Sequence, residues 1–260
     1  MGAPGPATGD SGRRRAGSDG AGPQLPLALR YPPDQRLDTY VAAPPGALAQ
    51  LRALAGGSHA EWACLVGSAG TGKTHLALAT CAAAEAAGRR AVYLPLMAAV
   101  GRLRAALEAL EGDAGGAGGA QTLVALDGLE AVAGRREDEL ALFDFHNRAR
   151  STGMGVLYTA QAAPDALSLA LPDLRSRLGQ CSRIVLAPLD DDGRREVLRE
   201  RARRRGLVLE ESALDWLLRR TGRDLASLTA LLDRLDRASL AAQRRITVPF
   251  LRQVLGTDAG

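Results

Sequence analysis

The sequence predicts an α/β fold, in which a parallel sheet carries helices on both faces and a small helical region follows. Three observations lead to this prediction. Five short apolar runs of strand length alternate with helical stretches up to residue 188. A glycine-rich loop of the pattern G-x-x-x-x-G-K-[ST] separates the first run from an alanine-rich stretch. After Pro188 no run resembles a strand, and leucines recur at helical spacing up to residue 255.

The five strand candidates fix where a ligand is expected. They are residues 62–66, 91–96, 122–127, 155–159 and 182–188. Because the carboxyl ends of parallel strands meet at one edge of a sheet, ligands bind at that edge. Gly67, Asp127 and Thr159 all lie at such ends, so we expect them to gather there.

Changes in composition along the chain divide it into segments. Residues 1–23 contain seven Gly and three Pro and cannot bury enough apolar surface to fold, so we expect a disordered tail. In residues 24–29, QLPLAL, every second residue from Leu25 is a leucine. We then expect an α/β nucleotide-binding domain over 30–188, a helical lid packed on it over 189–256, and a short tail over 257–260.

Composition also excludes some classes of protein. Hydrophobic residues make up 46% of the chain, enough for a sizeable core, but aromatic residues only 3%, so Ala, Leu and Val must build that core. No apolar run approaches the roughly 20 residues that span a bilayer, and none follows the N-terminal arginines, so neither a membrane helix nor a secretory signal is expected. The three cysteines lack metal-ligand spacing, which favours a reduced, cytoplasmic protein. The net charge of +4 does not by itself indicate nucleic-acid binding.

The one lysine among 33 Lys and Arg residues is Lys73, inside the segment GSAGTGKT. Gly70 and Gly72 let the backbone turn its N–H groups toward a phosphate, and Lys73 supplies a compact charge for β- and γ-phosphate oxygens. Thr74 offers a hydroxyl to Mg²⁺, so the segment predicts ATP or ADP binding with Mg²⁺. The alternative, a chance match in an Ala/Gly-rich chain, does not explain the strand before the loop or the helix after it. The expected nucleotide contacts are Gly67, Ser68, Ala69, Gly70, Thr71, Gly72, Lys73 and Thr74.

The second half of such a site is an acid at the end of another strand. Asp127 ends the run TLVALD and is the candidate for the Mg²⁺ side, the alternative being an Asp that caps the next turn. Many ATPases carry a second acid at the next position, where this chain has Gly128. Glu130 comes two residues later, with an orientation that the sequence leaves open. The sequence therefore predicts tight nucleotide binding and weak hydrolysis.

Several segments resemble one family. An α/β nucleotide domain with a short helical lid is the AAA+ layout. The segments YLPL (93–96), LFDFHNR (142–148), LPDLRSRL (171–178) and LDRLDRASLAAQRRITVPFLRQVL (232–255) are similar to the Hda family, short relatives of the replication initiator DnaA that inactivate it. The resemblance runs from about residue 24 to residue 255. DnaA has a C-terminal helix-turn-helix DNA-binding domain, and this chain ends where that domain would begin.

The resemblance gives QLPLAL a role. Hda-like proteins dock on the sliding clamp of DNA polymerase, its β subunit, through an N-terminal motif of the type QLxLxL. Gln24, Leu25, Leu27 and Leu29 match that motif. An extended peptide can place alternating leucines in a groove while the chain around it stays loose. The alternative is a strand that packs on the body of this chain.

The resemblance also implies roles for residues near the nucleotide. Arg177 would be an arginine finger acting in trans on ATP held by DnaA, with Arg175 as the alternative. Arg223 resembles the lid arginine that contacts nucleotide, the alternative being an ordinary exposed arginine. Thr159 resembles a polar sensor, the alternative being a buried hydroxyl bonded to backbone. Residues 160–164, AQAAP, replace the DRPP-type stretch of the initiator, so a role for that loop is in doubt.

The sequence thus favours a nucleotide-binding adaptor that stimulates hydrolysis by DnaA on the clamp and so represses re-initiation. Its partners would be DnaA, the clamp and, through the clamp, DNA, with homo-oligomerisation left open and no membrane. A rival is a stand-alone ATPase acting on DNA, such as a helicase loader or remodeller, and a third reading is a scaffold without nucleotide. The arginine-rich stretch 194–205 fits DNA binding or, because Glu196 and Glu200 interrupt it, a solvated helix face.

Overall fold

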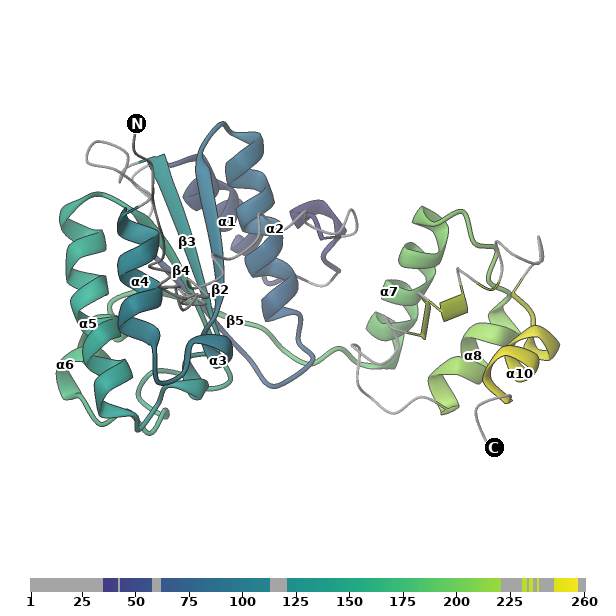
Figure 1. Ribbon diagram of the computed structural model, residues 1–260. Helices are drawn as coiled ribbons and strands as arrows, with labels where there is room; N and C mark the ends of the chain where they lie inside the picture. The colour runs from purple at the N-terminus through teal and green to yellow at the C-terminus, as the bar shows by residue number, and fades with distance from the viewer. Residues whose placement is uncertain are drawn as a thin grey trace, which may run out of the picture.

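A computed structural model describes residues 35–41, 43–57, 62–112, 121–220, 231–232, 234–235, 238 and 246–256. Figure 1 shows a sheet between two groups of helices and, beside it, a smaller helical lid reached through the segment after β5. The elements in chain order are η1 (Leu37–Thr39), α1 (Ala47–Gly56), β1 (Ala63–Val66), α2 (Lys73–Ala86), β2 (Arg90–Pro95), α3 (Leu96–Ala99), α4 (Leu103–Gly112), β3 (Thr122–Asp127), η3 (Leu129–Ala131), α5 (Arg136–Ser151), β4 (Gly155–Ala160), α6 (Pro172–Gly179), β5 (Ser182–Val185), α7 (Asp191–Arg204), α8 (Glu211–Arg220) and α10 (Val248–Gly256).

The sheet has five strands in the order β2-β3-β4-β1-β5, and every pairing is parallel. Parallel strands need crossover connections, and helices supply these here. Because all the strands run the same way, the loop after β1 and the ends of β3 and β4 lie at the same edge. The predicted fold class is confirmed.

Strand β5 is shorter than the run that predicted it. It ends at Val185, although the Leu186 N–H still donates to the Val66 carbonyl at 2.7 Å. Pro188 has no N–H to continue the ladder. Residues 186–190 therefore leave the sheet and lead into α7.

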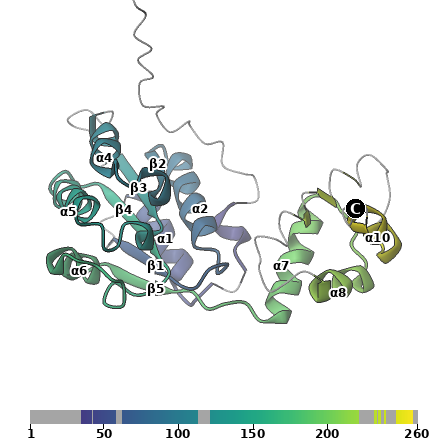
Figure 2. The ribbon, with the colours of Figure 1, turned by 60° about the horizontal axis from the view of Figure 1, so that its bottom comes forward.

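Two apolar clusters cover the two faces of the sheet. Helices α1 and α2 pack on one face, where Leu51, Leu65 and Leu76 are fully buried. Helices α4, α5 and α6 pack on the other, around Leu126 and Phe145. Figure 2 shows these two groups on opposite sides of the strands. Burial on both faces explains why the strands read as continuous apolar runs rather than alternating ones.

A buried aromatic group lies inside the α4–α6 side of the core. The His146 ring stacks on Tyr158 and meets Trp62 edge-on at 4.6 Å between centroids. The Nδ1 atom of His146 lies 3.0 Å from the Tyr158 hydroxyl, and its Nε2 atom has no partner among the described residues. Burial, with repulsion from Arg150 and Arg177, lowers the pKa of His146 from 6.5 to about 4. The ring is therefore neutral at pH 7 and serves as packing.

The lid has a core of its own. Leu214, Leu232, Leu235, Ile246 and Leu251 are among the residues buried in it. The apolar cluster of the lid is separate from the two clusters beside the sheet. That the lid packs on the nucleotide domain stays a prediction. The sequence also missed an isolated parallel bridge. Leu209 pairs there with Ile246, and the Ile246 N–H donates to the Val208 carbonyl at 3.0 Å.

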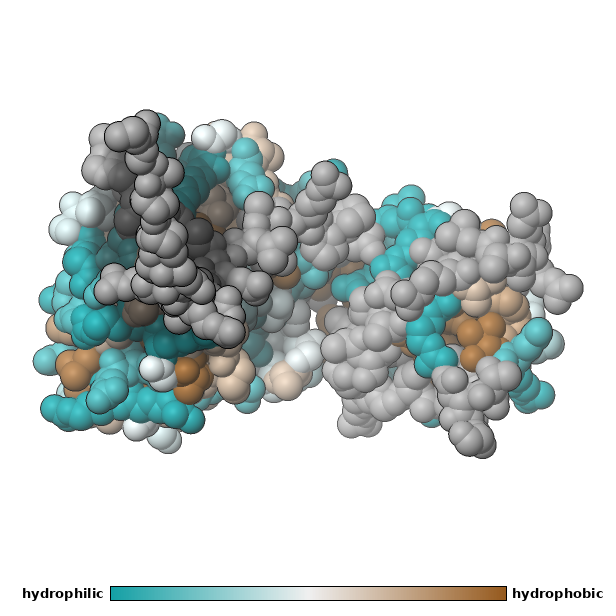
Figure 3. Space-filling model, in the orientation of Figure 1, coloured by the Kyte–Doolittle hydropathy of each residue, from teal (hydrophilic) through white to brown (hydrophobic). Residues whose placement is uncertain are grey.

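In Figure 3, apolar residues lie singly among hydrophilic ones over the sheet domain, and a group of apolar residues shows on the lid. The most exposed large apolar side chain of the described residues is Met97, at 71%. No helix within the described ranges is long and apolar enough to cross a membrane. The three cysteines are buried, and none of them forms a disulfide bond within the described residues.

Candidate functional site

The phosphate loop joins β1 to α2, as its sequence context predicts. Gly70 and Gly72 have φ of 78° and 86°, a conformation that glycine adopts without strain. Lys73 begins α2, is 9% exposed, and donates from Nζ to the carbonyls of Gly67 and Ser68 at 2.6 and 2.8 Å. Burial lowers the pKa of Lys73, while the charges of Glu130 and Asp127 act in the opposite direction. The ammonium group is thus held inside the turn of the loop.

The loop is closely packed at two glycines. A Cβ atom on Gly67 would lie 2.6 Å from the Leu186 carbonyl oxygen, and one on Gly72 would lie 2.7 Å from Cε2 of Tyr40. Tyr40 also donates its hydroxyl to the Thr71 carbonyl at 2.7 Å. The segment before α1 therefore lies against the phosphate loop and holds it from outside.

Asp127, at the end of β3, receives hydroxyl groups from three elements. Its Oδ2 atom accepts from Thr74 at 2.8 Å and from Tyr93 at 2.7 Å, and its Oδ1 atom accepts from Thr159. Burial and the hydrogen bond to Asp127 raise the pKa of Tyr93, so the phenol keeps its proton and donates. The structure thus brings Thr74, Asp127 and Thr159 together, as the strand ends predict.

Thr159 is fully buried and makes two contacts. Besides donating to Asp127, its Oγ1 atom accepts the Gly128 N–H at 2.9 Å. Thr159 therefore has the backbone hydrogen bond expected of a buried hydroxyl, and it also contacts the carboxylate proposed to bind the metal, as a polar sensor would. Thr159 therefore ties the end of β4 to the turn after β3.

The backbone conformation at the position after Asp127 disfavours any residue except glycine. Gly128 has φ of 91°, in the left-handed region, so any residue with a Cβ would be strained there. A Cβ at Gly128 would lie 3.6 Å from Glu130 Oε1, so the Glu130 carboxylate lies beside this position. Its other oxygen accepts the Gln161 N–H at 3.1 Å. Glu130 therefore points back toward the site, which the sequence left open.

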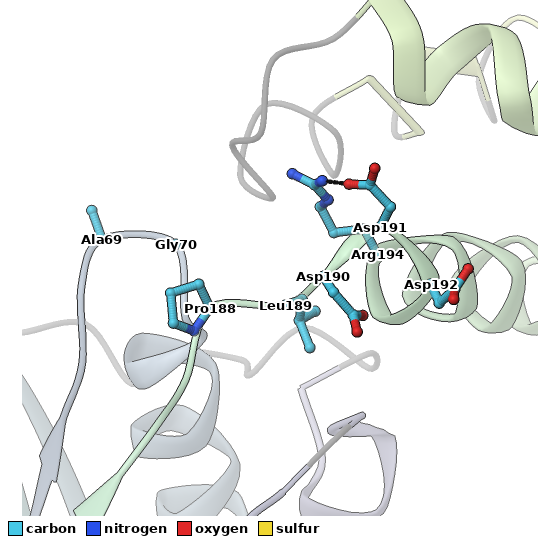
Figure 4. A pocket seen from close by; sticks show the side chains of 8 residues that line it. All are labelled: Ala69, Gly70, Pro188, Leu189, Asp190, Asp191, Asp192 and Arg194. Carbon is cyan, nitrogen blue, oxygen red and sulfur yellow. Dashed lines mark ion pairs between the residues drawn. The ribbon is translucent and has the colours of Figure 1, made fainter.

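A cavity of about 520 Å³ adjoins the phosphate loop. In Figure 4, Ala69, Gly70 and Pro188 lie on one side of it, and Asp190 and the start of α7 lie on the other. The volume lies within the range of small-molecule sites. Arg194 also lines the cavity and is 9% exposed, and it forms an ion pair with Asp191.

The residues at the loop fit a magnesium–nucleotide complex. No cluster of three or more His, Cys, Asp or Glu side chains that could hold a metal exists among the residues described. Mg²⁺ keeps several waters and needs only one or two protein ligands besides phosphate oxygens, a demand that Thr74 and Asp127 can meet. Backbone N–H groups at the start of α2 and the Lys73 ammonium suit phosphate.

The two candidate finger arginines lie differently on α6. Arg175 is half-buried and donates to the Leu169 carbonyl at 2.6 Å. The Arg177 side chain is exposed, with no hydrogen-bond or ion-pair partner in the part of the chain that the structure describes. Leu174 and Leu178 on the same helix are buried in the core. The helix is thus seated by its leucines and presents Arg177 outward.

Ion pairs occupy much of the arginine-rich helix α7. Arg195 pairs with Asp215, and Arg199 with Glu196 and Glu211. Glu200 pairs with Arg203 and Arg204, whose hydrogen bonds lower its pKa to about 2. These pairs favour a solvated helix face over a DNA-binding surface.

Some expected residues lie outside the described ranges, namely the tail 1–23, the peptide Gln24, Leu25, Leu27 and Leu29, the lid arginine Arg223, and residues 257–260. Sequence reasoning missed Tyr40 and Tyr93. Tyr93 carried a signal, because it is a polar-tipped aromatic near the carboxyl end of a predicted strand. Tyr40 carried none, since its partner is 31 residues away in the chain.

Residues 191–255 match the family described as Hda, lid domain. Domain III of DnaA from Thermotoga maritima is similar to this chain with a TM-score of 0.70 at 17% identity, covering 88% of this chain and 98% of that one. AMPPCP-bound DnaA from Aquifex aeolicus gives 0.61 at 22%, covering 79% and 67%. The RuvB Holliday junction branch migration motor of T. maritima gives 0.61 at 16%, covering 86% and 72%.

At 16–22% identity these similarities show the fold and not the function. The similar structures include a DNA motor as well as replication initiators. The match of the lid is more specific, because it points to one family, and it covers residues 191–255. The chain therefore has an α/β fold of the kind found in domain III of DnaA, and its residues 191–255 are similar in sequence to the Hda lid domain.

Proposed function

We propose that this chain is a nucleotide-binding AAA+ regulator that supplies an arginine finger to DnaA and so stimulates ATP hydrolysis by DnaA. The observation that carries the proposal is the exposed Arg177 on a firmly seated helix, in a chain whose own site lacks the usual second acid. The match of residues 191–255 to the Hda lid domain supports DnaA as the partner.

Nucleotide binding by this chain is supported by the loop around Lys73 and by the contact of Thr74 with Asp127. DnaA from A. aeolicus, which shares the fold, binds AMPPCP. When bound, ATP or ADP supplies the phosphate charge and Mg²⁺ offsets part of it. The role of Lys73 is to hold phosphate oxygens, and the role of Thr74 and Asp127 is to hold the metal side of the complex.

Weak intrinsic hydrolysis belongs to the same proposal. Gly128 offers no carboxylate to orient a water molecule, and its φ of 91° disfavours any replacement that has one. Glu130 lies beside this position, but its carboxylate already accepts from the Gln161 backbone. We expect bound nucleotide to set the conformation of the chain rather than to be turned over rapidly.

The action in trans rests on Arg177. A guanidinium that stabilises charge on a transferring phosphoryl group is worth orders of magnitude in rate. Arg175 does not compete for this role, because it donates to the Leu169 carbonyl within its own chain. Docking on the sliding clamp through Gln24, Leu25, Leu27 and Leu29 would bring the finger to DnaA near replicated DNA and so repress re-initiation.

The test is ATP hydrolysis by purified DnaA in the presence of this protein and DNA-loaded clamp. We expect Arg177→Ala to remove at least 90% of the stimulation, and Gln24→Ala/Leu25→Ala to remove the part of the stimulation that requires the clamp. The exposed Arg252 of α10 is a matched control, and Arg252→Ala is expected to stimulate as the wild type does. Full stimulation by Arg177→Ala would reject the finger.

The rival function, a stand-alone DNA-dependent ATPase, is favoured by the likeness to the RuvB motor. The ion-paired arginines of α7 speak against a DNA-binding role for that helix. In the same assay without DnaA, turnover by this chain that rises with DNA and falls with salt would support the rival.

A further inference from the structure

Glu139, in the first turn of α5, is a carboxylate with no exposed surface. Glutamate is almost never fully buried unless it is paired. No cation pairs with Glu139 among the described residues, so its charge has to be balanced in another way. The balance comes from three backbone N–H groups.

These donors belong to two loops. Oε1 of Glu139 accepts the Gly134 N–H at 2.6 Å and the Ala170 N–H at 2.9 Å, and Oε2 accepts the Leu171 N–H at 2.7 Å. Hydrogen bonds to an ionised acceptor are shorter and about twice as strong as neutral ones. One side chain thus joins the turn before α5 to the two residues that precede α6.

The position of Glu139 also uses two helix dipoles. Glu139 lies in the first turn of α5, and Leu171 is the N-cap residue of α6, which has no side-chain cap of its own. The positive ends of both helices therefore converge on one carboxylate. Figure 1 shows α5 and α6 side by side on the same face of the sheet. Glu139 thus accepts the N–H of the N-cap residue of α6 from a neighbouring helix.

Arg175 secures the same segment from the other side. Its guanidinium donates to the Leu169 carbonyl, one residue before the pair that Glu139 holds. Leu174 and Leu178 anchor the inner face of α6 in the core. Arg177 lies on the exposed side of this helix, as Asp173 and Ser176 do. The start of α6 is therefore held by side-chain hydrogen bonds to the backbone of three consecutive residues, Leu169, Ala170 and Leu171.

We propose that Glu139 is a positioning residue for Arg177: by holding Ala170 and Leu171 it fixes the start of α6 and so the direction in which the guanidinium projects. The inference rests on the proposed function, because it assigns the Arg177 finger a support. Its physical basis is that loss of one bond at the helix start tilts a short helix, and a displacement of about 1 Å costs on the order of a hundredfold in rate.

The test variant is Glu139→Gln. The glutamine keeps one acceptor oxygen but turns an NH₂ group toward one of the three N–H groups, so at least one donor loses its bond. The matched control is Asp138→Asn. Asp138 is the neighbouring residue, also buried, and it accepts from the Gly101 N–H instead of from the segment before α6. The two variants remove the same charge one residue apart.

Two readouts separate positioning from general damage. Hydrogen exchange of the Ala170 and Leu171 amides is expected to become at least tenfold faster in Glu139→Gln and to stay unchanged in Asp138→Asn. In the DnaA assay, Glu139→Gln is expected to lower the plateau of stimulation at least fivefold, while the concentration for half-maximal stimulation stays within twofold. A partly unfolded variant would instead raise that concentration and reach the wild-type plateau.

The Arg177→Ala arm makes the outcomes distinguishable. If Arg177→Ala loses stimulation and Glu139→Gln keeps the full plateau, the positioning inference is overturned and the finger stands. If Arg177→Ala keeps stimulation, the proposed function fails and the inference falls with it, while the exchange rates still report whether Glu139 holds the helix start. If Glu139→Gln does not fold, Glu139→Asp replaces it in the test. This variant keeps the negative charge on a shorter side chain, and it is also expected to lower the plateau of stimulation at least fivefold.

Discussion

At Gly72, backbone conformation and side-chain contact act in the same direction. The residue has φ of 86°, and a Cβ there would meet Tyr40 at 2.7 Å. Gly88, after α2, shares the left-handed conformation with φ of 76°, but a Cβ there would meet nothing within 4 Å. The two glycines therefore separate the cost of strain from the cost of contact with Tyr40.

We expect Gly88→Ala to lower the free energy of unfolding by about 1 kcal/mol, because an L-residue is strained in the left-handed backbone conformation. Gly72→Ala should lower it by at least about 2 kcal/mol, because a close contact is added to the strain. It should also weaken nucleotide binding, since Tyr40 or the loop has to move. Urea unfolding and calorimetric titration with ADP measure both effects. Equal losses in the two variants would mean that the Tyr40 contact is relaxed without cost.

His146 makes the stability of the sheet domain depend on pH. Its pKa is about 4 in the folded protein, below the ordinary 6.5, so the unfolded chain binds the proton more strongly. The stabilisation is fully present above pH 6.5 and is lost as the pH falls toward about 4. We expect His146→Gln to lose less unfolding free energy than the wild type between pH 7 and pH 4.5, as followed by urea denaturation. Parallel pH curves for the two proteins would contradict this assignment.

At the scale of the element, α7 depends on its first residues. Asp190 is the N-cap residue, and its side chain accepts the Gly193 N–H at 2.7 Å. Asp192 lies in the first turn and has the helix dipole but no capping bond. We expect Asp190→Ala to destabilise the lid by about 1 kcal/mol and Asp192→Ala by less than half of that. Thermal unfolding followed by helical circular dichroism compares them, and equal losses would show that the dipole rather than the cap matters.

At the scale of the whole molecule, the separate cores imply separate stabilities. Leu232 is fully buried in the lid core and Leu126 in the sheet core. A buried Leu→Ala substitution costs roughly 2–5 kcal/mol. We expect Leu232→Ala to speed hydrogen exchange in α8 and α10 and leave β3 and β4 protected, and Leu126→Ala to do the reverse. Uniform loss of protection in either variant would mean that the two cores unfold as one unit.

The fold and the centre of the site were predictable because parallel strands obey simple rules. Once the apolar runs are placed in a parallel sheet, Asp127 and Thr159 must lie at the same edge as the phosphate loop. The contacts of Asp127 with Thr74 and Thr159 follow from that topology. The strand order itself, β2-β3-β4-β1-β5, does not follow from local pattern, because crossover lengths permit several orders.

What could not be predicted depends on loops. Glu139 and Ala170 are 31 residues apart in the chain, and the helical pattern says nothing about which loop returns to α5. The sequence does contain one sign that Glu139 is buried and hydrogen-bonded. Glu139 shares a helical face with Leu142 and His146, and an acid on a buried face needs hydrogen-bond donors. The orientation of Glu130 was also open, because it follows a turn that begins with a positive φ at Gly128.

The conformation of Gly128 affects which substitutions at this position are tolerated. In an extended turn, a glycine could be replaced by an acid through a single substitution, and hydrolysis could become faster in one step. At φ of 91°, with its N–H bonded to Thr159, the first substitution is penalised by backbone strain before any catalytic benefit arises. Selection for faster turnover would therefore act first on neighbours such as Glu130, leaving the glycine in place.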